Sequence, residues 1–207
     1  MTVAPTELAA GQTLRERKRA QTRERIVAAG VRLFSTKGYD DTTVADIAAE
    51  ADIGTRTFFG YFEGKDALLF GAGNDRIDIA LSTIAEASPD DDPAGVLLHA
   101  LDAAAEATDD DFMSEQAVLR LRLVDSVPAV RARGAQAELA ATRDIAAALL
   151  AKFTQLDPAQ AAGIAGAFVG ASTAAVQAVL HDSSGLTAPQ RAERIRSAVA
   201  AGLGVKE

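Results

Sequence analysis

The sequence predicts an all-α protein built from two helical domains. Three observations carry this prediction. Aromatic residues make up only 5% of the chain, alanine is abundant, and β-branched residues seldom alternate with polar ones as they do in strands. Apolar residues instead recur at helical spacing over long stretches. Clusters of Gly, Pro and Asp separate these stretches at positions that suit helix starts and ends.

The first helix is expected from about Leu14 to Lys37, after a loose tail over residues 1–12. Gly38 follows the helix and suits the position just past a helix end. Positions on one side of this helix recur at helical spacing, at Thr22, Ile26, Ala29 and Leu33.

The second helix is expected to begin at a capping box formed by Thr43 and Asp46. In this motif the Thr hydroxyl accepts a hydrogen bond from the amide three residues on, and the acid accepts one in return. The helix that follows has one apolar face, made by Val44, Ile47, Ala48 and Ala51. At about nine residues it is too short to be stable alone, so it must pack against its neighbours.

A third, short helix is expected within residues 55–62, between turns at 52–54 and 63–65. Two short helices joined by a tight turn form a helix-turn-helix unit, whose second helix presents its first residues to the DNA major groove. The residue types fit this use, with small residues at the helix contact, a bulky core and a polar outer face. These three sets are Ala48, Ala51 and Gly54; Ile47, Ile53, Phe58 and Phe62; and Thr55, Arg56, Thr57 and Tyr61.

The rest of the chain predicts a second helical domain. Its helices are expected over residues 65–87, 94–108, 112–124, 127–153, 158–181 and 188–203. The separating loops are rich in Pro, Asp and Ser, as in SPDDDP at 88–93. The predicted organisation is a tail over residues 1–12, a helix-turn-helix domain over 13–62 and a second domain over 63–207.

The net charge of −8 is unevenly distributed. Residues 1–66 contain ten basic and ten acidic side chains, whereas residues 67–207 contain 11 basic and 19 acidic ones. Residues 12–37 contain eight basic side chains and only two acidic ones. Two interpretations remain open for this basic segment: a patch that orients the protein on phosphates, or a solvated helix face.

Several classes of function are disfavoured by composition. The absence of Cys excludes disulfides and thiolate metal sites, and His99 and His181 form no pair suited to zinc. No nucleophile or acid–base constellation is evident, so we expect neither an enzyme nor a cofactor. No signal peptide is evident, and the apolar stretch at 159–180 is mostly Ala, Gly and Ser, as in a buried helix of a cytosolic protein.

Residues 22–70 resemble the TetR family of bacterial repressors. The resemblance rests on an AxxLFxxKGY-like segment, on TTVADIAAEA, and on TFFGYFEGKDALL. Together these landmarks are highly specific, and beyond residue 70 the resemblance is one of architecture. The family implies nine or ten helices, a homodimer, and an effector pocket in the C-terminal domain.

The resemblance carries DNA-binding roles to matching positions. Thr43 would meet a phosphate through its amide and hydroxyl, and Arg56 is the best candidate for a base contact because Arg reads guanine bidentately. Tyr61 and Lys65 match positions that hold the DNA backbone. The remaining expected contacts lie at the start of the third helix and in a basic arm ahead of the first: Thr55, Thr57, Arg15, Arg17, Lys18 and Arg19.

Four positions depart from the family pattern. Asp52 replaces a usual turn Gly, at small cost because Asp tolerates left-handed backbone. Gly54 replaces a capping Ser and is a slightly weaker cap. Phe59 replaces a frequent phosphate-binding Tyr and lacks its hydroxyl, and Gly60 removes another possible contact. These two changes shift the backbone contacts towards Tyr61, Lys65 and the basic arm.

The effector pocket is expected among the helices of the second domain. The candidate residues are His99, Phe112, Met113, Gln116, Leu119, Arg120, Leu123, Phe168 and Gln177. For the apolar members, ordinary core packing remains an alternative, and His99 is equally consistent with a core or surface residue. Arg120 is suited to an effector carboxylate or phosphate, or to an internal ion pair with Asp102, Asp125 or Glu115.

Glycines at 163, 166 and 170 give the helix over 158–181 a flat side that lets another backbone approach. In the family the last two long helices form a four-helix dimer bundle. The dimer interface is therefore expected on helices 158–181 and 188–203, with Gly163, Gly166, Gly170, Gln177 and Arg194. Close packing inside one subunit is the alternative.

The predicted function is a cytoplasmic homodimeric repressor that releases a palindromic operator when a small molecule binds. Two alternatives stay open. One is a helical ligand carrier or enzyme with a vestigial helix-turn-helix. The other is an activator, or a repressor without an effector. No membrane partner and no metal are expected.

Overall fold

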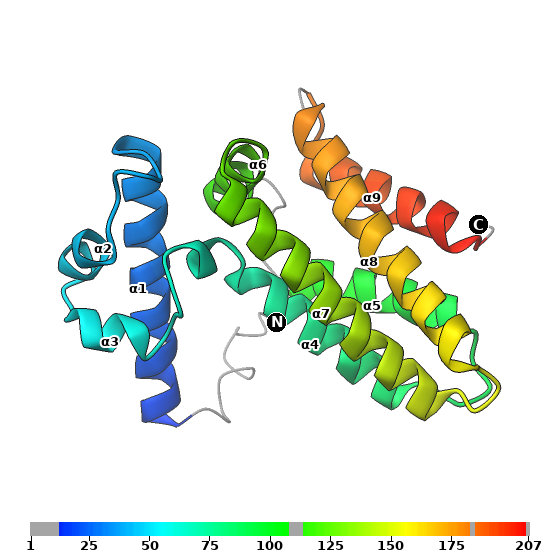
Figure 1. Ribbon diagram of the computed structural model, residues 1–207. Helices are drawn as coiled ribbons and strands as arrows, with labels where there is room; N and C mark the ends of the chain where they lie inside the picture. Colours follow the sequence, from blue (N-terminus) through cyan, green and yellow to red (C-terminus); the bar gives the residue numbers. More distant parts are fainter. Residues whose placement is uncertain (1–12, 108–113, 183–184, 206–207) are drawn as a thin grey trace, which may run out of the picture. The chain divides into compact units, whose positions relative to one another are not determined.

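The computed structural model describes residues 13–107, 114–182 and 185–205, and all regular structure in these residues is helical (Figure 1). The predicted all-α class is confirmed. The chain divides into two compact units, Met1–Leu68 and Leu69–Glu207, and each is described by itself. The first contains α1 (Leu14–Thr36), α2 (Val44–Glu50), α3 (Thr55–Phe59) and most of the short 3₁₀ helix η1 (Asp66–Leu69), whose last residue, Leu69, belongs to the second unit.

The second unit contains the remaining six α-helices of the described chain. They are α4 (Gly71–Glu86), α5 (Pro93–Ala107), α6 (Glu115–Ser126), α7 (Pro128–Lys152), α8 (Pro158–His181) and α9 (Ala188–Leu203). The predicted bounds of α5, α7, α8 and α9 are confirmed to within one residue. The helix predicted over 112–124 begins at Glu115 and extends to Ser126, and residues 112 and 113 lie outside the described residues.

The single helix expected over 65–87 is wrong at its start. The chain first forms η1, and α4 begins only at Gly71. The amide of Ala67 donates to the carbonyl of Gly64 at 3.2 Å, which is the tighter i to i+3 spacing of a 3₁₀ turn. Leu68 is fully buried against Gly30, where an added Cβ would collide with the leucine side chain. Tertiary packing of this segment therefore overrides the helical periodicity of the sequence.

The first unit packs α1 against α2 and α2 against α3. Its most deeply buried side chains are those of Ile26, Ile47, Phe58 and Leu68. Because Leu68 belongs to this core, the compact unit extends six residues beyond the sequence-based boundary at residue 62.

In the second unit α8 packs most extensively on α7 and α9, and α4 packs on α5 and α7. The guanidinium Nε of Arg196 on α9 donates to Oδ1 of Asp102 on α5 at 3.1 Å. Asp102 therefore pairs with Arg196, and not with Arg120 as one sequence interpretation allowed. By length and composition α8 could cross a membrane, a property that core helices of soluble proteins share, and 28% of its most apolar window is buried.

Candidate nucleic-acid interface and ligand cavity

The predicted capping box at the start of α2 is confirmed. The Thr43 hydroxyl accepts from the Asp46 amide at 3.1 Å, and Asp46 Oδ2 accepts from the Thr43 amide at 2.8 Å. The Lys37 ammonium also donates to Asp46 Oδ2, at 2.7 Å. These bonds, led by the one from Lys37, hold the pKa of the Asp46 carboxyl well below its usual value. The carboxylate is therefore a fixed part of the unit at neutral pH.

This capping box also occupies the donors expected to meet DNA. The Thr43 hydroxyl donates to Asp46 Oδ2 at 2.8 Å, so both the amide and the hydroxyl of Thr43 are bonded to one carboxylate oxygen. A phosphate that takes these donors must replace that oxygen. Contact at Thr43 thus requires an exchange of one anionic acceptor for another.

The turn between α2 and α3 behaves as its composition predicts. Asp52 adopts a left-handed backbone with φ of 53°, which confirms that Asp serves in place of the usual Gly. Gly54 is the N-cap of α3, with φ of −80° and no side-chain cap. A Cβ built on Gly54 would meet nothing within 4 Å in the described chain, so the space for a capping side chain is open.

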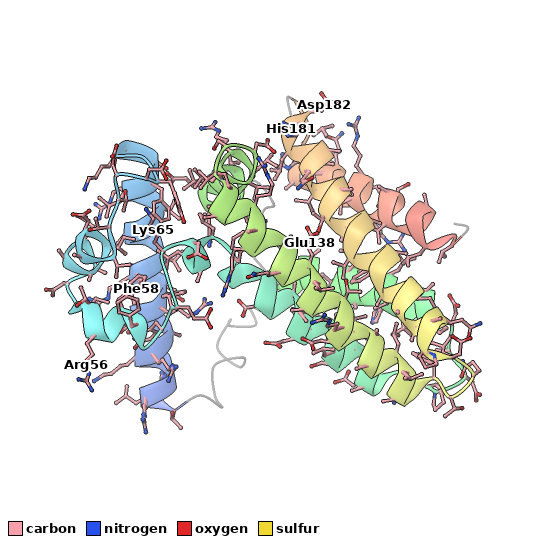
Figure 2. All side chains as sticks on the ribbon, viewed as in Figure 1. Arg56, Phe58, Lys65, Glu138, His181 and Asp182 are labelled. Atoms are coloured by element: carbon pink, nitrogen blue, oxygen red, sulfur yellow. The ribbon has the colours of Figure 1, made fainter. Side chains whose placement is uncertain are left out.

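Helix α3 presents its first three residues outward. Thr55, Arg56 and Thr57 are exposed, and Figure 2 shows the Arg56 side chain extending away from the helix. Phe58 is completely buried, whereas its neighbour Phe59 is 59% exposed. The two rings meet edge to face, with centroids 5.5 Å apart. The outer surface of α3 therefore combines one cation, two hydroxyls and one bare aromatic ring.

The basic residues expected as an arm ahead of the first helix lie within α1 instead. Arg, Lys, Glu and Ala favour helix, so the segment LRERKRA forms the first turns of α1. Arg15, Arg17, Lys18 and Arg19 are exposed there. Arg19 lies over the ring of the half-buried Tyr61, with its guanidinium carbon 5.5 Å from the centroid.

Arg23 was not among the predicted site residues, although it lies one turn after Arg19 on the same face of α1. Its guanidinium lies 5.2 Å from the centroid of Phe62. The i to i+4 spacing of two arginines would have been the signal in the sequence. Aromatic rings that follow α3 thus hold two cations of α1 in place.

Lys65 occupies a different environment from the one that the resemblance implied. Its ammonium donates to the carbonyls of Tyr39 at 2.5 Å, Thr42 at 2.8 Å and Asp40 at 3.4 Å. It also lies 4.2 Å from the centroid of the Tyr39 ring. Burial, with smaller contributions from the carboxylates of Asp66 and Asp40, raises the pKa of Tyr39 to about 12. A phosphate contact by Lys65 would compete with three internal acceptors.

The second unit contains a partly open cavity of about 390 Å³ among α4, α5, α6, α7 and α8. Three of the predicted effector residues line it: Arg120, Phe168 and Gln177. Gln116, Leu119 and Leu123 do not, because α6 turns a neighbouring stripe towards the cavity. That stripe has the spacing i, i+3, i+4, i+7 and consists of Ala117, Arg120, Leu121 and Val124.

The other predicted effector residues also lie elsewhere. His99 is exposed and lines a separate depression with Glu86, Asp91 and Asp92. Phe112 and Met113 lie outside the described residues. The sequence did not predict the cavity-lining residues of α4, α7 and most of α8, because apolar periodicity does not show which side of a buried helix faces a cavity. The polar ones among them are Arg76, Arg131, Glu138, Ser172 and Thr173.

The glycines of α8 differ in their surroundings. Gly163 and Gly170 are exposed, and a Cβ on either would meet no described atom within 4 Å. Gly166 is half-buried, and its Cβ would lie 3.9 Å from Cγ2 of Thr142. Gln177 and Arg194 are exposed. The close approach inside the subunit uses Gly202 of α9 instead, where a Cβ would lie 2.8 Å from that of Ala171.

Comparison with known proteins finds similarity to part of the first unit. Residues 26–72 match the family model described as bacterial regulatory proteins, tetR family. The transcriptional regulator TcmR of Streptomyces glaucescens is 39% identical over 56 residues, which cover 27% of this chain and 25% of TcmR. HbdR of Aromatoleum sp. (strain CIB) is 42% identical over 50 residues, 24% of this chain and 22% of HbdR. The matched segment thus spans about a quarter of the length of these relatives.

Solved structures resemble nearly the whole chain. A TetR-family regulator from Syntrophomonas wolfei aligns with a TM-score of 0.60 at 20% identity, over 91% of this chain and 98% of that one. The Thermus thermophilus repressor FadR, solved with lauroyl-CoA, aligns with a TM-score of 0.55 at 23% identity, over 89% and 96%. The chain therefore has the same fold as these solved regulators, and residues 26–72 match the tetR-family model.

Proposed function

We propose that this TetR-family chain is a DNA-binding transcriptional regulator, acting as a homodimeric repressor that a small molecule releases from a palindromic operator. One observation carries the proposal: a capped helix-turn-helix presents the exposed Thr55, Arg56 and Thr57 at the start of α3. Such first residues of a recognition helix are the ones that reach base edges in the major groove.

The proposed DNA contacts are of two kinds, to base edges and to phosphates. Arg56 would read a guanine through a bidentate pair, while the cations of α1 and the hydroxyl of Tyr61 would hold phosphates. Arg15, Arg17, Lys18 and Arg19 supply charge on one segment of an otherwise acidic protein. Such phosphate contacts fix the position of the protein on DNA without reading its sequence.

The dimer would form through α8 and α9. The exposed Gly163 and Gly170 leave space for close approach by a second copy. Gln177 and Arg194 supply polar contacts on the same two helices. A two-fold axis there would present two copies of α3 to half-sites about 34–36 Å apart on one face of the DNA.

The effector would occupy the cavity of the second unit. Its volume of about 390 Å³ lies within the range of small-molecule sites, about 300–1,000 Å³. The related fold of FadR was solved with lauroyl-CoA, which is a property of that protein and supports a ligand role for this unit. We place the protein in the cytoplasm and assign it no catalytic activity. Within the described residues, no group of three or more His, Asp or Glu side chains is arranged to hold a metal ion.

The test is fluorescence anisotropy with a labelled duplex from the gene's own upstream region, against excess non-specific DNA. Arg56→Ala should weaken specific binding by about tenfold or more and relax sequence preference at one base pair. Arg143→Ala, an exposed cation of α7, is the matched control and should leave binding unchanged. Equal binding by the Arg56 variant and the native protein would contradict the assignment of α3.

A further inference from the structure

The walls of the cavity are mostly aliphatic. Ile77 of α4, Leu101 of α5 and Val176 of α8 are among the lining residues, with Phe70 and Phe168 as the aromatic ones. Such a surface binds an apolar body and offers few groups that fix polar atoms. The body of a matching ligand is therefore apolar.

Positive charge gathers at this apolar site. Arg76, Arg120 and Arg131, from three different helices, line the cavity, whereas Glu138 is the one acidic residue among the described lining. The surrounding residues 67–207 have the opposite balance, with 11 basic and 19 acidic side chains. The cavity thus concentrates cations inside an acidic domain, and this local excess favours an anion.

The three arginines are not equivalent. Arg131 donates to the carbonyls of Val124 at 3.0 Å and Asp125 at 2.5 Å, so it is fixed at the end of α6. Arg120 makes a longer bond of 3.4 Å to the carbonyl of Leu69. On α8 the buried Ser172 hydroxyl oxygen has no hydrogen-bond partner among the described residues. A ligand oxygen at this place would satisfy a polar group that is otherwise costly to bury.

We propose that the cavity binds an amphipathic organic anion, an aliphatic body with a carboxylate, whose charge pairs with Arg120 and Arg76 and whose oxygen also meets Ser172. This rests on the proposed function in that it takes the cavity as the effector site. Guanidinium and carboxylate groups match in a bidentate geometry. A neutral ligand would offer the two arginines no negative charge, and a cation would be repelled.

Arg120 also links the cavity to the start of the unit. Leu69, whose carbonyl it contacts, precedes α4 by two residues and directly follows the last residue of the first unit. A carboxylate that pairs with this guanidinium would compete with the long bond to the Leu69 carbonyl. Ligand binding would in this way act on the segment that leads into α4.

Calorimetry on the full chain without DNA tests the ligand class, with decanoate, 1-decanol and decyltrimethylammonium as probes of one chain length. Decanoate should bind at least about tenfold more tightly than 1-decanol, as expected for one charge-assisted contact, and the ammonium compound least tightly. Absence of saturable decanoate binding, or equal binding of decanoate and 1-decanol, overturns the proposal.

Variants locate the charge. Arg120→Gln should weaken decanoate about tenfold and change 1-decanol less than twofold, Arg120→Lys should restore part of the loss, and the control Arg143→Gln should change neither. If the Arg120 variants lose affinity for decanoate and 1-decanol to the same extent, Arg120 has a structural role and its assignment as the carboxylate-binding residue is overturned. Separate anisotropy experiments distinguish this proposal from the proposed function. If decanoate binds the protein without releasing DNA, effector control by decanoate is contradicted and the ligand class stands. If the protein binds DNA specifically but does not bind decanoate, the ligand class is contradicted and the DNA-binding function stands.

Discussion

The two units of the chain differ in how far known proteins resemble them in sequence. TcmR and HbdR match part of the chain at 39% and 42% identity, whereas the two solved structures described above align with about nine-tenths of the chain at 20% and 23% identity. In the first unit, Thr43 and Asp46 form a capping box, and Asp52 has the left-handed backbone of the turn before α3. The second unit instead packs its helices around a cavity.

The strongest test of this comparison is the pair of neighbouring phenylalanines at the end of α3. Phe58→Ala should destabilise the first unit by about 3–5 kcal/mol and abolish DNA binding, because the ring is completely buried. Phe59→Ala removes the same number of atoms from a side chain that is 59% exposed, and should change the free energy of unfolding by less than about 0.5 kcal/mol. Thermal unfolding followed by circular dichroism measures both. A large cost at Phe59 would contradict the assigned face of α3.

Features that depend on neighbours in the chain could be predicted from the sequence, whereas contacts between distant segments could not. Periodicity and capping signals identify Phe58 as core and Thr43 as a cap, since these depend on neighbours in the chain. The sequence does not show that Lys65 contacts three carbonyls that lie 23–26 residues earlier, or that α6 turns Ala117 instead of Gln116 to the cavity. Such contacts depend on how helices rotate against one another, and adjacent stripes of α6 are equally apolar.

Replacement of Lys65 distinguishes a structural from a DNA-binding role. If the three carbonyl contacts persist in the DNA complex, Lys65→Met should lower the stability of the first unit by about 1.5–3 kcal/mol, because an ammonium donor to the 39–42 connector is lost. The salt dependence of DNA binding by the folded variant should then match that of the native protein. Unchanged stability, with a salt slope smaller by about 1, would instead identify Lys65 as a phosphate contact.

A capping threonine precedes one helix in each unit. Thr43 and Thr187 both form capping boxes, at the starts of α2 and α9. Thr→Ala at either position should cost about 1 kcal/mol in unfolding free energy. Thr43→Ala alone should also weaken DNA binding after correction for the unfolded fraction, because a phosphate would use the same donors. Equal DNA binding by the two variants would limit Thr43 to capping.

The smallest expected effect concerns the cap of α3. Gly54→Ser should raise the stability of the first unit by a few tenths of a kcal/mol, because Ser caps more strongly and the Cβ meets no described atom within 4 Å. Gly60→Ser is the control and should bring no such gain, since its Cβ would lie 3.2 Å from the Thr57 carbonyl. The affinity of the Gly54→Ser variant for operator DNA then tests whether DNA binding requires glycine at this position. A stabilised variant with weaker binding would mean that DNA approaches Gly54 too closely for a side chain. A stabilised variant with native affinity would mean that this departure from the family pattern has no part in reading DNA.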